Sequence, residues 1–286
     1  MRQSFDNKKR VVVKIGSSSL QHKNTGELDF NKMETLVRIL CDLRNQGKDV
    51  VLVTSGAIAV GKKVIGTKNE NNKTSIKQAC SAIGQARLMT TYQKLFAEYN
   101  QVIAQVLMTK YTITDDISRL NAHNTFSELF EFGVIPIVNE NDTVSTDEIE
   151  IGDNDNLSAI VTRLVGADLL ILLSDIDGLY SDDPRQNKDA VFIEEVDTLD
   201  DRFMSMGKVS TGSDVGTGGM NTKLIAAKVA TSAGADMVIA NAKNVKILYE
   251  IMDGENVGTL FRANPDSSLQ LNDIIDEIHK IHQKNG

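Results

Sequence analysis

The chain has 286 residues, a net charge of −8 and 41% apolar residues, and these values exclude several classes of protein. A negatively charged surface repels a phosphate backbone, so we expect no nucleic-acid partner. No apolar run approaches the roughly 20 residues that span a membrane, and the first residues are too polar for a signal peptide. We therefore expect a cytoplasmic protein with no membrane partner, long enough for one large α/β domain or two modest ones.

Short apolar runs alternate with helical patterns along the chain. Strands are predicted at residues 11–15, 50–54, 102–108, 134–138, 169–173 and 237–240. Helices are predicted between the cap Asp29 and Gly47 and at residues 74–99, 119–132, 156–165 and 221–233. The strands are continuously apolar rather than alternating, which indicates a mostly parallel central sheet sandwiched between helices.

The chain has no internal repeat and no flexible linker, so we expect one domain with two lobes. Residues 143–151 alternate polar and β-branched side chains and predict a hairpin that projects from the sheet. Pro265 then interrupts the chain, and a helical pattern rich in isoleucine follows. Residues 264–286 are therefore predicted to form a C-terminal helical tail.

Parallel sheets bind ligands at the carboxyl ends of their strands, so the residues that follow each strand are candidates for chemistry. Lys14 lies near the end of the first strand, and Gly16 and the serines 17–19 follow the strand. An ammonium group there can meet a phosphate, while the backbone N–H groups of the loop bind its oxygens. The alternative is a lysine of an edge strand that extends its ammonium group into water.

Ser55 and Gly56 follow the second strand and open a helical pattern. The free N–H groups at a helix N-terminus suit an anion. The run from Gly56 to Lys63 comes close to the P-loop pattern, but Lys63 stands where a hydroxyl must bind Mg²⁺. We therefore interpret Ser55 and Gly56 as an anion-binding helix start and not as a P-loop.

Two clusters rich in Asp and Asn lie close together after the fourth strand, at residues 139–142 and 152–156. Asn and Asp are also common in turns and helix caps, which explains one member of the second cluster but not the whole set. A calcium site is another alternative, although the spacing does not match the EF-hand loop. We therefore treat both clusters as candidate ligand-binding residues.

Ser174 and Asp175 end the next strand, and a glycine-rich loop at residues 216–219 opens the helix that carries Lys223. A glycine loop that leads into a helix N-terminus, with a lysine in the first turn, has the components of a phosphate site. The alternative is a flexible loop in solvent.

Taken in order, these motifs resemble the amino acid kinase family over residues 8–262. The resemblance is carried by the segments VVKIGSS, VTSGAIA, IVNEND, GDNDNLS, DGLY and GTGGMNTK. Within the family, the chain is most similar to members that phosphorylate L-glutamate. The resemblance implies the amino acid kinase fold and a kinase that transfers the γ-phosphoryl group of ATP to the γ-carboxylate of L-glutamate, the first step of proline biosynthesis.

The family's catalytic positions match Lys14, Lys223 and Asp155. The resemblance implies that the two lysines flank the transferring phosphoryl group and neutralise its charge, while Asp155 holds them in position. Asp155 is not expected to act as a base, because the acceptor carboxylate is already ionised at neutral pH.

The family's ligand-binding positions also match residues of this chain. The glutamate-binding positions match Ser55, Gly56, Asp142 and Asn154, and a carboxylate at position 142 suits the substrate's α-ammonium group. The ATP-binding positions match Lys14, Gly16, Ser17, Ser174, Asp175, Thr217, Gly218, Gly219, Met220, Asn221, Thr222 and Lys223.

The resemblance further implies cofactors, partners and boundaries. Mg²⁺ would be held mainly by the ATP phosphates, proline would be a feedback inhibitor, and the protein would be a homodimer or homotetramer. The kinase domain would span residues 1–263, with a substrate lobe at about 8–165 and a nucleotide lobe at about 166–263. Many relatives carry an additional C-terminal PUA domain, for which residues 264–286 leave no room.

Two other interpretations remain open. The chain could be another kinase of the same family, acting on N-acetylglutamate, aspartate, carbamate or UMP. It could also be a non-catalytic nucleotide-binding paralogue, which would have no need to keep Lys14, Lys223 and Asp155. The presence of all three residues favours an enzyme.

Overall fold

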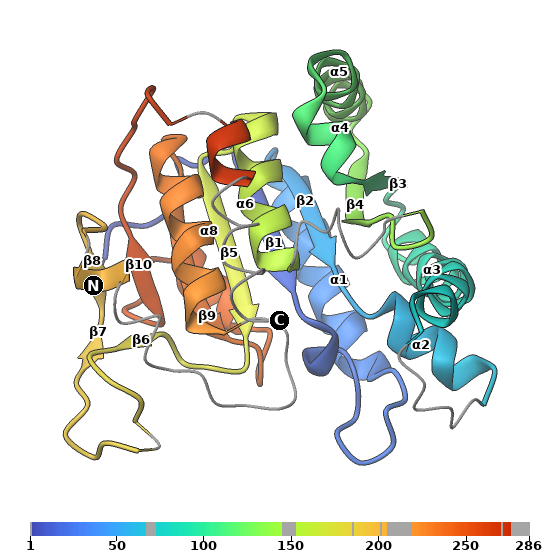
Figure 1. Cartoon of the computed structure of the whole chain (residues 1–286), viewed down its shortest axis with the longest axis horizontal. Helices are drawn as coiled ribbons and strands as arrows, with labels where there is room; N and C mark the ends of the chain where they lie inside the picture. Colours follow the sequence, from blue (N-terminus) through green and yellow to red (C-terminus); the bar gives the residue numbers. More distant parts are fainter. Residues whose placement is uncertain are drawn as a thin grey trace. The chain divides into compact units, whose positions relative to one another are not determined.

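The structure is a computed structural model and describes residues 2–66, 73–144, 153–184, 186–200, 202–204, 219–269 and 271–275. The chain divides into two compact units (Figure 1). Unit 1 comprises Met1–Lys14 and Ile151–Gly286, and unit 2 comprises Ile15–Glu150. Most of the predicted hairpin at residues 143–151 lies outside the described residues.

Unit 2 contains three parallel strands in the order β3-β4-β2, namely β3 (Ile103–Met108), β4 (Ile135–Glu140) and β2 (Asp49–Thr54). Its helices are α1 (Phe30–Asn45), α2 (Ala57–Val64), α3 (Thr74–Ala97), α4 (Lys110–Thr114) and α5 (Asp116–Glu131). α1 contacts β2, α3 contacts β3 and α5 contacts β4, so helices flank these strands. Among the described strands β3 is an edge, and it is accordingly less buried than β4.

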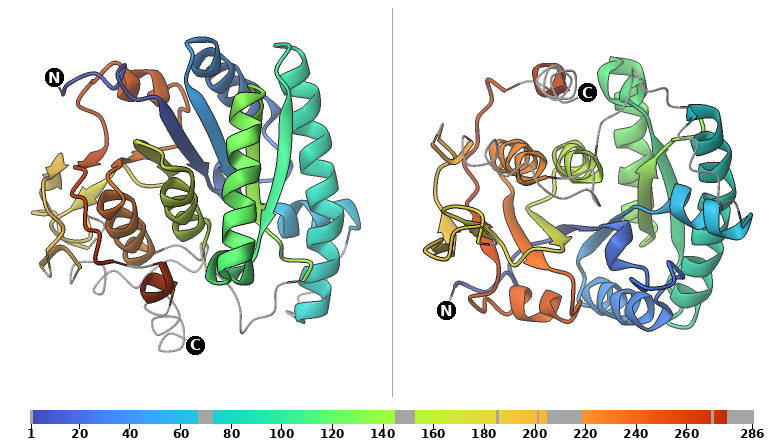
Figure 2. Two further views of the ribbon diagram at one scale, coloured as in Figure 1. Left: turned by 90° about the horizontal axis from the view of Figure 1, so that it is seen from above. Right: turned by 60° about the horizontal axis from the view of Figure 1, so that its bottom comes forward.

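Unit 1 contains the strands β1 (Arg10–Ile15), β5 (Leu169–Ser174), β9 (Asp236–Asn241), β10 (Thr259–Phe261) and β8 (Glu195–Val196), in that spatial order. β5 and β9 are parallel, whereas β10 is antiparallel to β9. The helices α6 (Asn154–Val165) and α8 (Met220–Ser232) lie side by side on one face, and α9 (Ile247–Met252) lies on the other (Figure 2). The strands β6 (Leu179–Tyr180) and β7 (Phe192–Ile193) form a separate small sheet.

The predicted fold class is confirmed, because the strands are mostly parallel and helices flank them. All six predicted strands are present, each within two residues of its predicted ends. The sequence pattern does not predict the short elements α4, α9, β6, β7, β8 and β10, since runs of two to six residues carry little periodicity. The lobes at residues 8–165 and 166–263 stay a prediction, and the unit boundary lies before α6 rather than after it.

Two helices begin earlier than predicted, because an aspartate caps each of them. The side chain of Asp115 accepts a hydrogen bond from the backbone N–H of Ser118, which starts α5 at residue 116 instead of 119. Asp153 likewise accepts from the backbone N–H of Asp155, which starts α6 at residue 154 instead of 156. Each cap satisfies an N–H group that the first turn leaves without a partner in the helix.

α2 and α3 cross in unit 2 at two glycines. A Cβ atom added at Gly84 would lie 1.7 Å from the carbonyl oxygen of Ala57, and one added at Gly61 would lie 1.8 Å from that of Cys80. Only glycine permits the two backbones to approach so closely. The crossing therefore fixes the position of α2, and with it the loop of Ser55 and Gly56 that precedes the helix.

The described part of the predicted tail packs on α6 and α8 of unit 1. The backbone N–H of Asn264 donates to the carbonyl of Thr231 on α8 at 3.0 Å, and Arg163 on α6 donates to the carbonyl of Leu269 at 2.6 Å. Ile274 and Ile275 are buried. Residues 276–286 lie outside the description. None of the helices in the described ranges is both long enough and apolar enough to cross a membrane.

Candidate active site

The first turn of α6 carries two aspartates. Asp153 has an extended backbone, and its side chain accepts the N–H of Asp155 at 3.3 Å, so Asp153 is the cap and Asp155 lies inside the helix. Asp155 is only 1% exposed. A carboxylate buried to this degree destabilises the fold unless cations or hydrogen-bond donors meet it.

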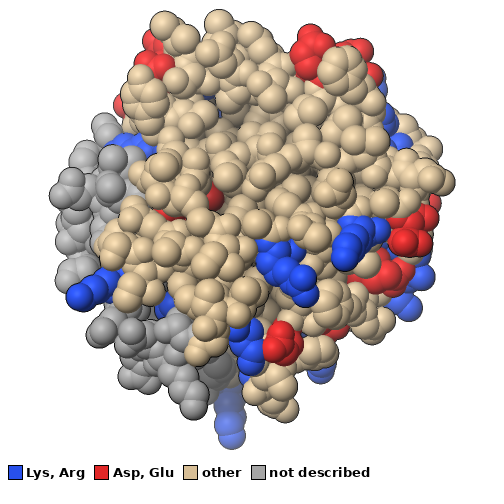
Figure 3. All heavy atoms as spheres, turned by 90° about the vertical axis from the view of Figure 1, so that its right-hand side faces the viewer, with Lys and Arg blue, Asp and Glu red and all other residues tan. Residues whose placement is uncertain are grey.

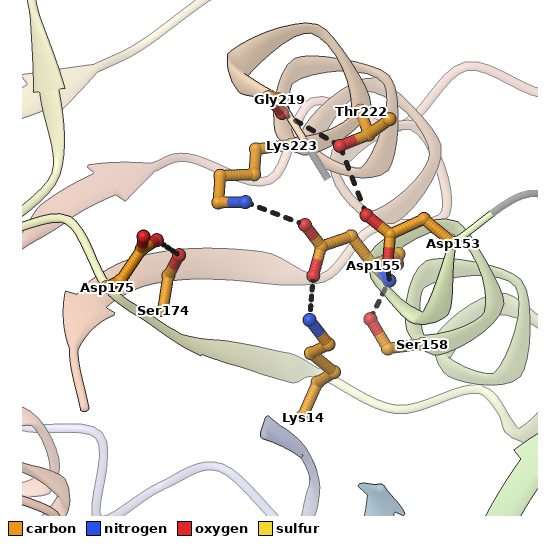
Figure 4. A network of polar contacts seen from close by, with 9 residues as sticks. All are labelled: Lys14, Asp153, Asp155, Ser158, Ser174, Asp175, Gly219, Thr222 and Lys223. Atoms are coloured by element: carbon orange, nitrogen blue, oxygen red, sulfur yellow. Dashed lines mark hydrogen bonds and ion pairs between the residues drawn. The ribbon is translucent and has the colours of Figure 1, made fainter. Parts of the chain in front are cut away.

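Two lysines from distant parts of the sequence meet the two oxygens of Asp155 (Figure 4). Nζ of Lys14 on β1 lies 2.5 Å from Oδ1, and Nζ of Lys223 in the first turn of α8 lies 3.0 Å from Oδ2. The lysines are 7% and 5% exposed, so Lys14 does not extend its ammonium group into water. The structure thus brings together, within unit 1, the three residues that the sequence indicates as catalytic.

The charges in this cluster reinforce one another. Burial alone would raise the pKa of Asp155, but the two ammonium groups outweigh it and lower that pKa to about 2. Burial alone would lower the pKa of Lys14, but the carboxylates of Asp155 and Asp153 outweigh it, and the pKa lies above its ordinary value. Both residues are therefore charged at neutral pH.

Asp153 is a second carboxylate of this cluster, and the sequence analysis assigns it no role of its own. The hydroxyl of Thr222 on α8 lies 3.4 Å from its Oδ2, which links the starts of α6 and α8. Burial and the charge of Asp155 raise the pKa of Asp153, while Lys14 and Lys223 act in the opposite direction. The signal that could have identified it is the pair of aspartates two residues apart at a helix start.

Ser174 and Asp175 lie at the carboxyl end of β5, as the sequence predicts. The Ser174 hydroxyl donates to Oδ1 of Asp175 at 3.1 Å, and Ser174 is buried (Figure 4). This strand end carries a hydroxyl and a carboxylate, which can hydrogen-bond the hydroxyl and amino groups of a nucleotide.

The described part of the glycine-rich loop is its last residue, Gly219, which precedes α8. Its carbonyl accepts the hydroxyl of Thr222 at 2.8 Å, and Met220 and Asn221 lie in the same first turn. The backbone N–H groups of such a turn have no partner in the helix and suit an anion. Thr217 and Gly218, two further predicted ATP-binding residues, lie outside the described residues.

In unit 2, the loops that follow β1 and β2 approach each other. Gly16 precedes the short 3₁₀ turn Ser17–Ser19, and Gly56 precedes α2 with a left-handed φ of 105°. A Cβ atom at Gly56 would lie 3.2 Å from the Cβ of Ser17. Both the dihedral angle and the contact favour glycine here. Ser55 lies directly before this turn, and the following residues are helical, so the interpretation against a P-loop is confirmed.

Asp142 lies two residues after β4. It accepts a hydrogen bond from the Ser81 hydroxyl of α3 at 3.0 Å. Burial raises the pKa of Asp142, and the Ser81 hydrogen bond partly offsets this effect. The sequence analysis does not single out Ser81, because one serine in a helix forms no recognisable motif. The remaining predicted substrate residue, Asn154, is the buried first residue of α6 in unit 1.

The described residues contain no group of three or more His, Cys, Asp or Glu side chains that could hold a metal ion. Both oxygens of Asp155 face lysine ammonium groups, and Asp153 caps α6. These carboxylates do not form an open set of oxygen ligands of the kind that a divalent cation binds.

Comparisons with known proteins point to one family. The model of the amino acid kinase family matches residues 9–241. A glutamate 5-kinase from Clostridium perfringens is 48% identical over 92% of this chain and 98% of its own length. A glutamate 5-kinase from Carboxydothermus hydrogenoformans is 50% identical over 91% of this chain and 70% of its own length. The two relatives differ in how much of their own length this chain matches. The match covers nearly the whole of the Clostridium protein but only 70% of the Carboxydothermus protein.

Solved structures with this fold are more distant in sequence. The carbamate kinase from Giardia lamblia bound to AMP-PNP has a TM-score of 0.63 and 16% identity, over 91% of this chain and 100% of that protein. At this level of identity, the likeness establishes the fold and not the substrate.

Proposed function

Because the chain belongs to the amino acid kinase family, we propose that it is an ATP-dependent transferase that phosphorylates the γ-carboxylate of L-glutamate. The product is γ-glutamyl 5-phosphate, and the reaction is the first step of proline biosynthesis. The observation that carries the proposal is the buried cluster in which Lys14 and Lys223 both contact Asp155. The substrate assignment is supported by relatives named glutamate 5-kinase that match nearly their full length.

Lys14 and Lys223 supply the positive charge that phosphoryl transfer requires. An oxygen of the glutamate γ-carboxylate attacks the γ-phosphorus, the bond between this phosphorus and the β,γ-bridging oxygen breaks, and ADP leaves. Negative charge spreads over the equatorial oxygens, and two ammonium groups already held in place can donate hydrogen bonds to them. Asp155 positions both lysines. It removes no proton, because the acceptor carboxylate is ionised at neutral pH.

We propose the Mg²⁺ complex of ATP as the donor substrate. Since the described carboxylates form no metal site, the ion would be held mainly by the β- and γ-phosphates of the nucleotide. Ser174, Asp175, the loop residues Thr217 to Gly219 and the first turn of α8 from Met220 to Lys223 are the proposed nucleotide contacts. The backbone N–H groups of Gly16 and Ser17 are proposed to donate hydrogen bonds to the transferring phosphoryl group. The start of a 3₁₀ turn leaves such N–H groups without a partner in the turn.

For the acceptor, we propose that Ser55, Gly56, Asp142 and Asn154 contact glutamate. The partly buried carboxylate of Asp142 would pair with the α-ammonium group, and no ion pair within the described residues involves it. The helix start at Gly56 would bind a carboxylate through its free N–H groups. Proline also carries an ammonium group and a carboxylate, and we propose that it inhibits by competing for the same residues.

We also propose that the protein is a cytoplasmic homodimer or homotetramer that associates through unit 2. The exposed residues in the first part of α3 are small or apolar, namely Ser75, Ala79, Ala82, Ile83 and Ala86, and the exposed Arg87 follows them. Figure 3 shows few Lys, Arg, Asp or Glu side chains over the upper part of the side of unit 2 on which α3, α4 and α5 lie. Two copies with a net charge of −8 repel each other, which favours contact through an uncharged surface. Light scattering of the purified protein measures its mass directly, and a monomer would contradict this proposal.

A substrate panel tests the proposed reaction. ADP release is measured with glutamate, aspartate, N-acetylglutamate, carbamate and UMP, each with MgATP, and then with glutamate in the presence of proline. Glutamate is expected to give the highest kcat/KM, because its free ammonium group suits Asp142. Faster turnover on another substrate would replace the glutamate assignment, and no turnover on any of them would favour a non-catalytic paralogue.

A further inference from the structure

The inner side of α3 holds the carboxyl ends of two strands of unit 2 through buried polar side chains. Ser81 donates to Asp142 after β4, and Asn139 at the end of β4 donates to Gln85 at 3.0 Å. Farther along the helix, the Tyr92 hydroxyl lies 3.0 Å from that of Thr54 at the end of β2. Positions 81, 85 and 92 lie on one face of the helix, since 85 is about one turn and 92 about three turns after 81.

Of these contacts, the Ser81 hydrogen bond is the one to a residue that is proposed to bind the substrate, Asp142. Ser81 is 2% exposed, and its hydroxyl lies 3.0 Å from Oδ2 of Asp142. Within the described residues, Oδ1 of Asp142 has no hydrogen-bond donor and neither oxygen has a cation. One oxygen is thus held by the protein while the other remains available to a ligand.

The hydrogen bond also favours the ionised form of Asp142. Burial acts against this form and raises the pKa of the carboxyl group, and the Ser81 hydroxyl is the influence that lowers it. The nearest acidic neighbour in sequence is Glu140, which is the buried last residue of β4. A substrate ammonium group binds an ionised carboxylate far better than a protonated one.

We propose that Ser81 is a positioning residue for the amino-acid substrate: its hydrogen bond orients Asp142 so that Oδ1 can bind the substrate's α-ammonium group. This inference rests on the proposed function, because it assigns the ammonium group to Asp142. Ser81 itself does not touch the substrate in this arrangement.

The test is the variant Ser81→Ala, which keeps a residue with a high helix propensity at a buried position. The KM for glutamate is expected to rise about tenfold, the scale of one hydrogen bond to a charged group. Both kcat and the KM for ATP should stay within about twofold, because the lysine cluster is untouched. The acid limb of the kcat/KM profile should move to higher pH, since Asp142 loses the donor that lowers its pKa.

Two further variants separate a positioning role from a general loss of packing. Thr91→Val is the matched control: Thr91 is a buried hydroxyl on the same helix, and it donates at 3.0 Å only to the backbone carbonyl of Arg87. This variant should keep the wild-type KM for glutamate. Ser81→Cys keeps a small side chain with a donor at the same place, although sulfur is larger and a weaker donor than oxygen, and it should give a KM between those of the wild type and Ser81→Ala.

A double-mutant cycle with Asp142→Asn distinguishes the inference from the function on which it rests. If Ser81 acts through Asp142, adding Ser81→Ala to Asp142→Asn should raise the KM no further. If Asp142→Asn raises the KM but Ser81→Ala leaves it unchanged, or if the two effects multiply, the role of Ser81 is overturned and the role of Asp142 stands. If Asp142→Asn itself keeps the wild-type KM, the assignment of the ammonium group fails.

Discussion

Replacing Lys223 with alanine is expected to lower kcat by about 10²-fold or more, the scale of losing one preorganised charge in a phosphoryl-transfer site. The reason is geometric. Lys223 is 5% exposed and its ammonium group is already held 3.0 Å from Asp155, so it is placed before the donor arrives and needs no reorganisation during the reaction. Steady-state ADP release at saturating glutamate and MgATP measures the effect.

The matched control is Lys228→Ala, which removes a lysine five residues farther along the same helix. Residue 228 is half-buried, and Lys228 makes no ion pair with Asp155. This variant should keep kcat within about threefold, since the charge at the cluster is unchanged. Wild-type kcat in a folded Lys223→Ala protein, verified by circular dichroism, would show that the lysine takes no part in catalysis.

The second large effect is expected for Asp155→Asn, which should both inactivate the protein and destabilise it. The amide keeps the shape of the side chain but leaves the buried ammonium groups of Lys14 and Lys223 without their shared countercharge. Removing one partner from a buried ion pair costs about 3–5 kcal/mol in the free energy of unfolding. Urea denaturation at pH 7 measures the stability loss, and the ADP assay measures the loss of turnover.

The pH dependence of this stability difference has a defined sign. The pKa of Asp155 is lowered in the folded state to about 2, so its contribution is fully present above its unfolded pKa of about 3.9 and is lost as the pH falls towards 2. The difference in unfolding free energy between the wild type and Asp155→Asn should therefore be constant near neutral pH and shrink below about pH 4.

As a control, Asp115→Asn alters the partly exposed cap of α5, whose carboxylate also has a lowered pKa, chiefly through its hydrogen bond to the Ser118 backbone. Asn caps helices about as well as Asp, so the stability difference of this variant from the wild type should be much smaller. A stability difference for Asp155→Asn that stays equally small at every pH would show that the cluster contributes little to folding.

The residues changed in Lys223→Ala and Asp155→Asn lie in the first turns of two helices, α8 and α6, that contact each other. The cap at Asp153 sets the first turn of α6, and Thr222 joins this cap to α8, one residue before Lys223. Because two helices and one strand each supply a charged group, the cluster forms only when unit 1 is folded. Catalysis and stability are expected to depend on the same few contacts for this reason.

Much of the fold could be predicted from the sequence, because its signals are local. The strand at Leu169–Ser174 is continuously apolar and ends in polar residues, and both features follow from burial on two faces. The cap of α1 at Asp29 can also be predicted, because aspartate is a preferred N-cap residue. Its side chain accepts the backbone N–H of Lys32. The sequence pattern predicts the starts of α5 and α6 three and two residues too late, because Asp115 and Asp153 are equally typical of loops.

The sequence by itself determined which residue types stand at the ends of the elements: a lysine near the end of β1, an aspartate pair at the start of α6 and a lysine in the first turn of α8. Tertiary structure alone decided that Lys14, Asp155 and Lys223 meet, because their separation in sequence says nothing about distance in space. It also decided the roles of Asp153 and Ser81. Asp153 is linked to α8 through the Thr222 hydroxyl, and Ser81 is linked to Asp142 after β4. No local pattern of side chains records either contact.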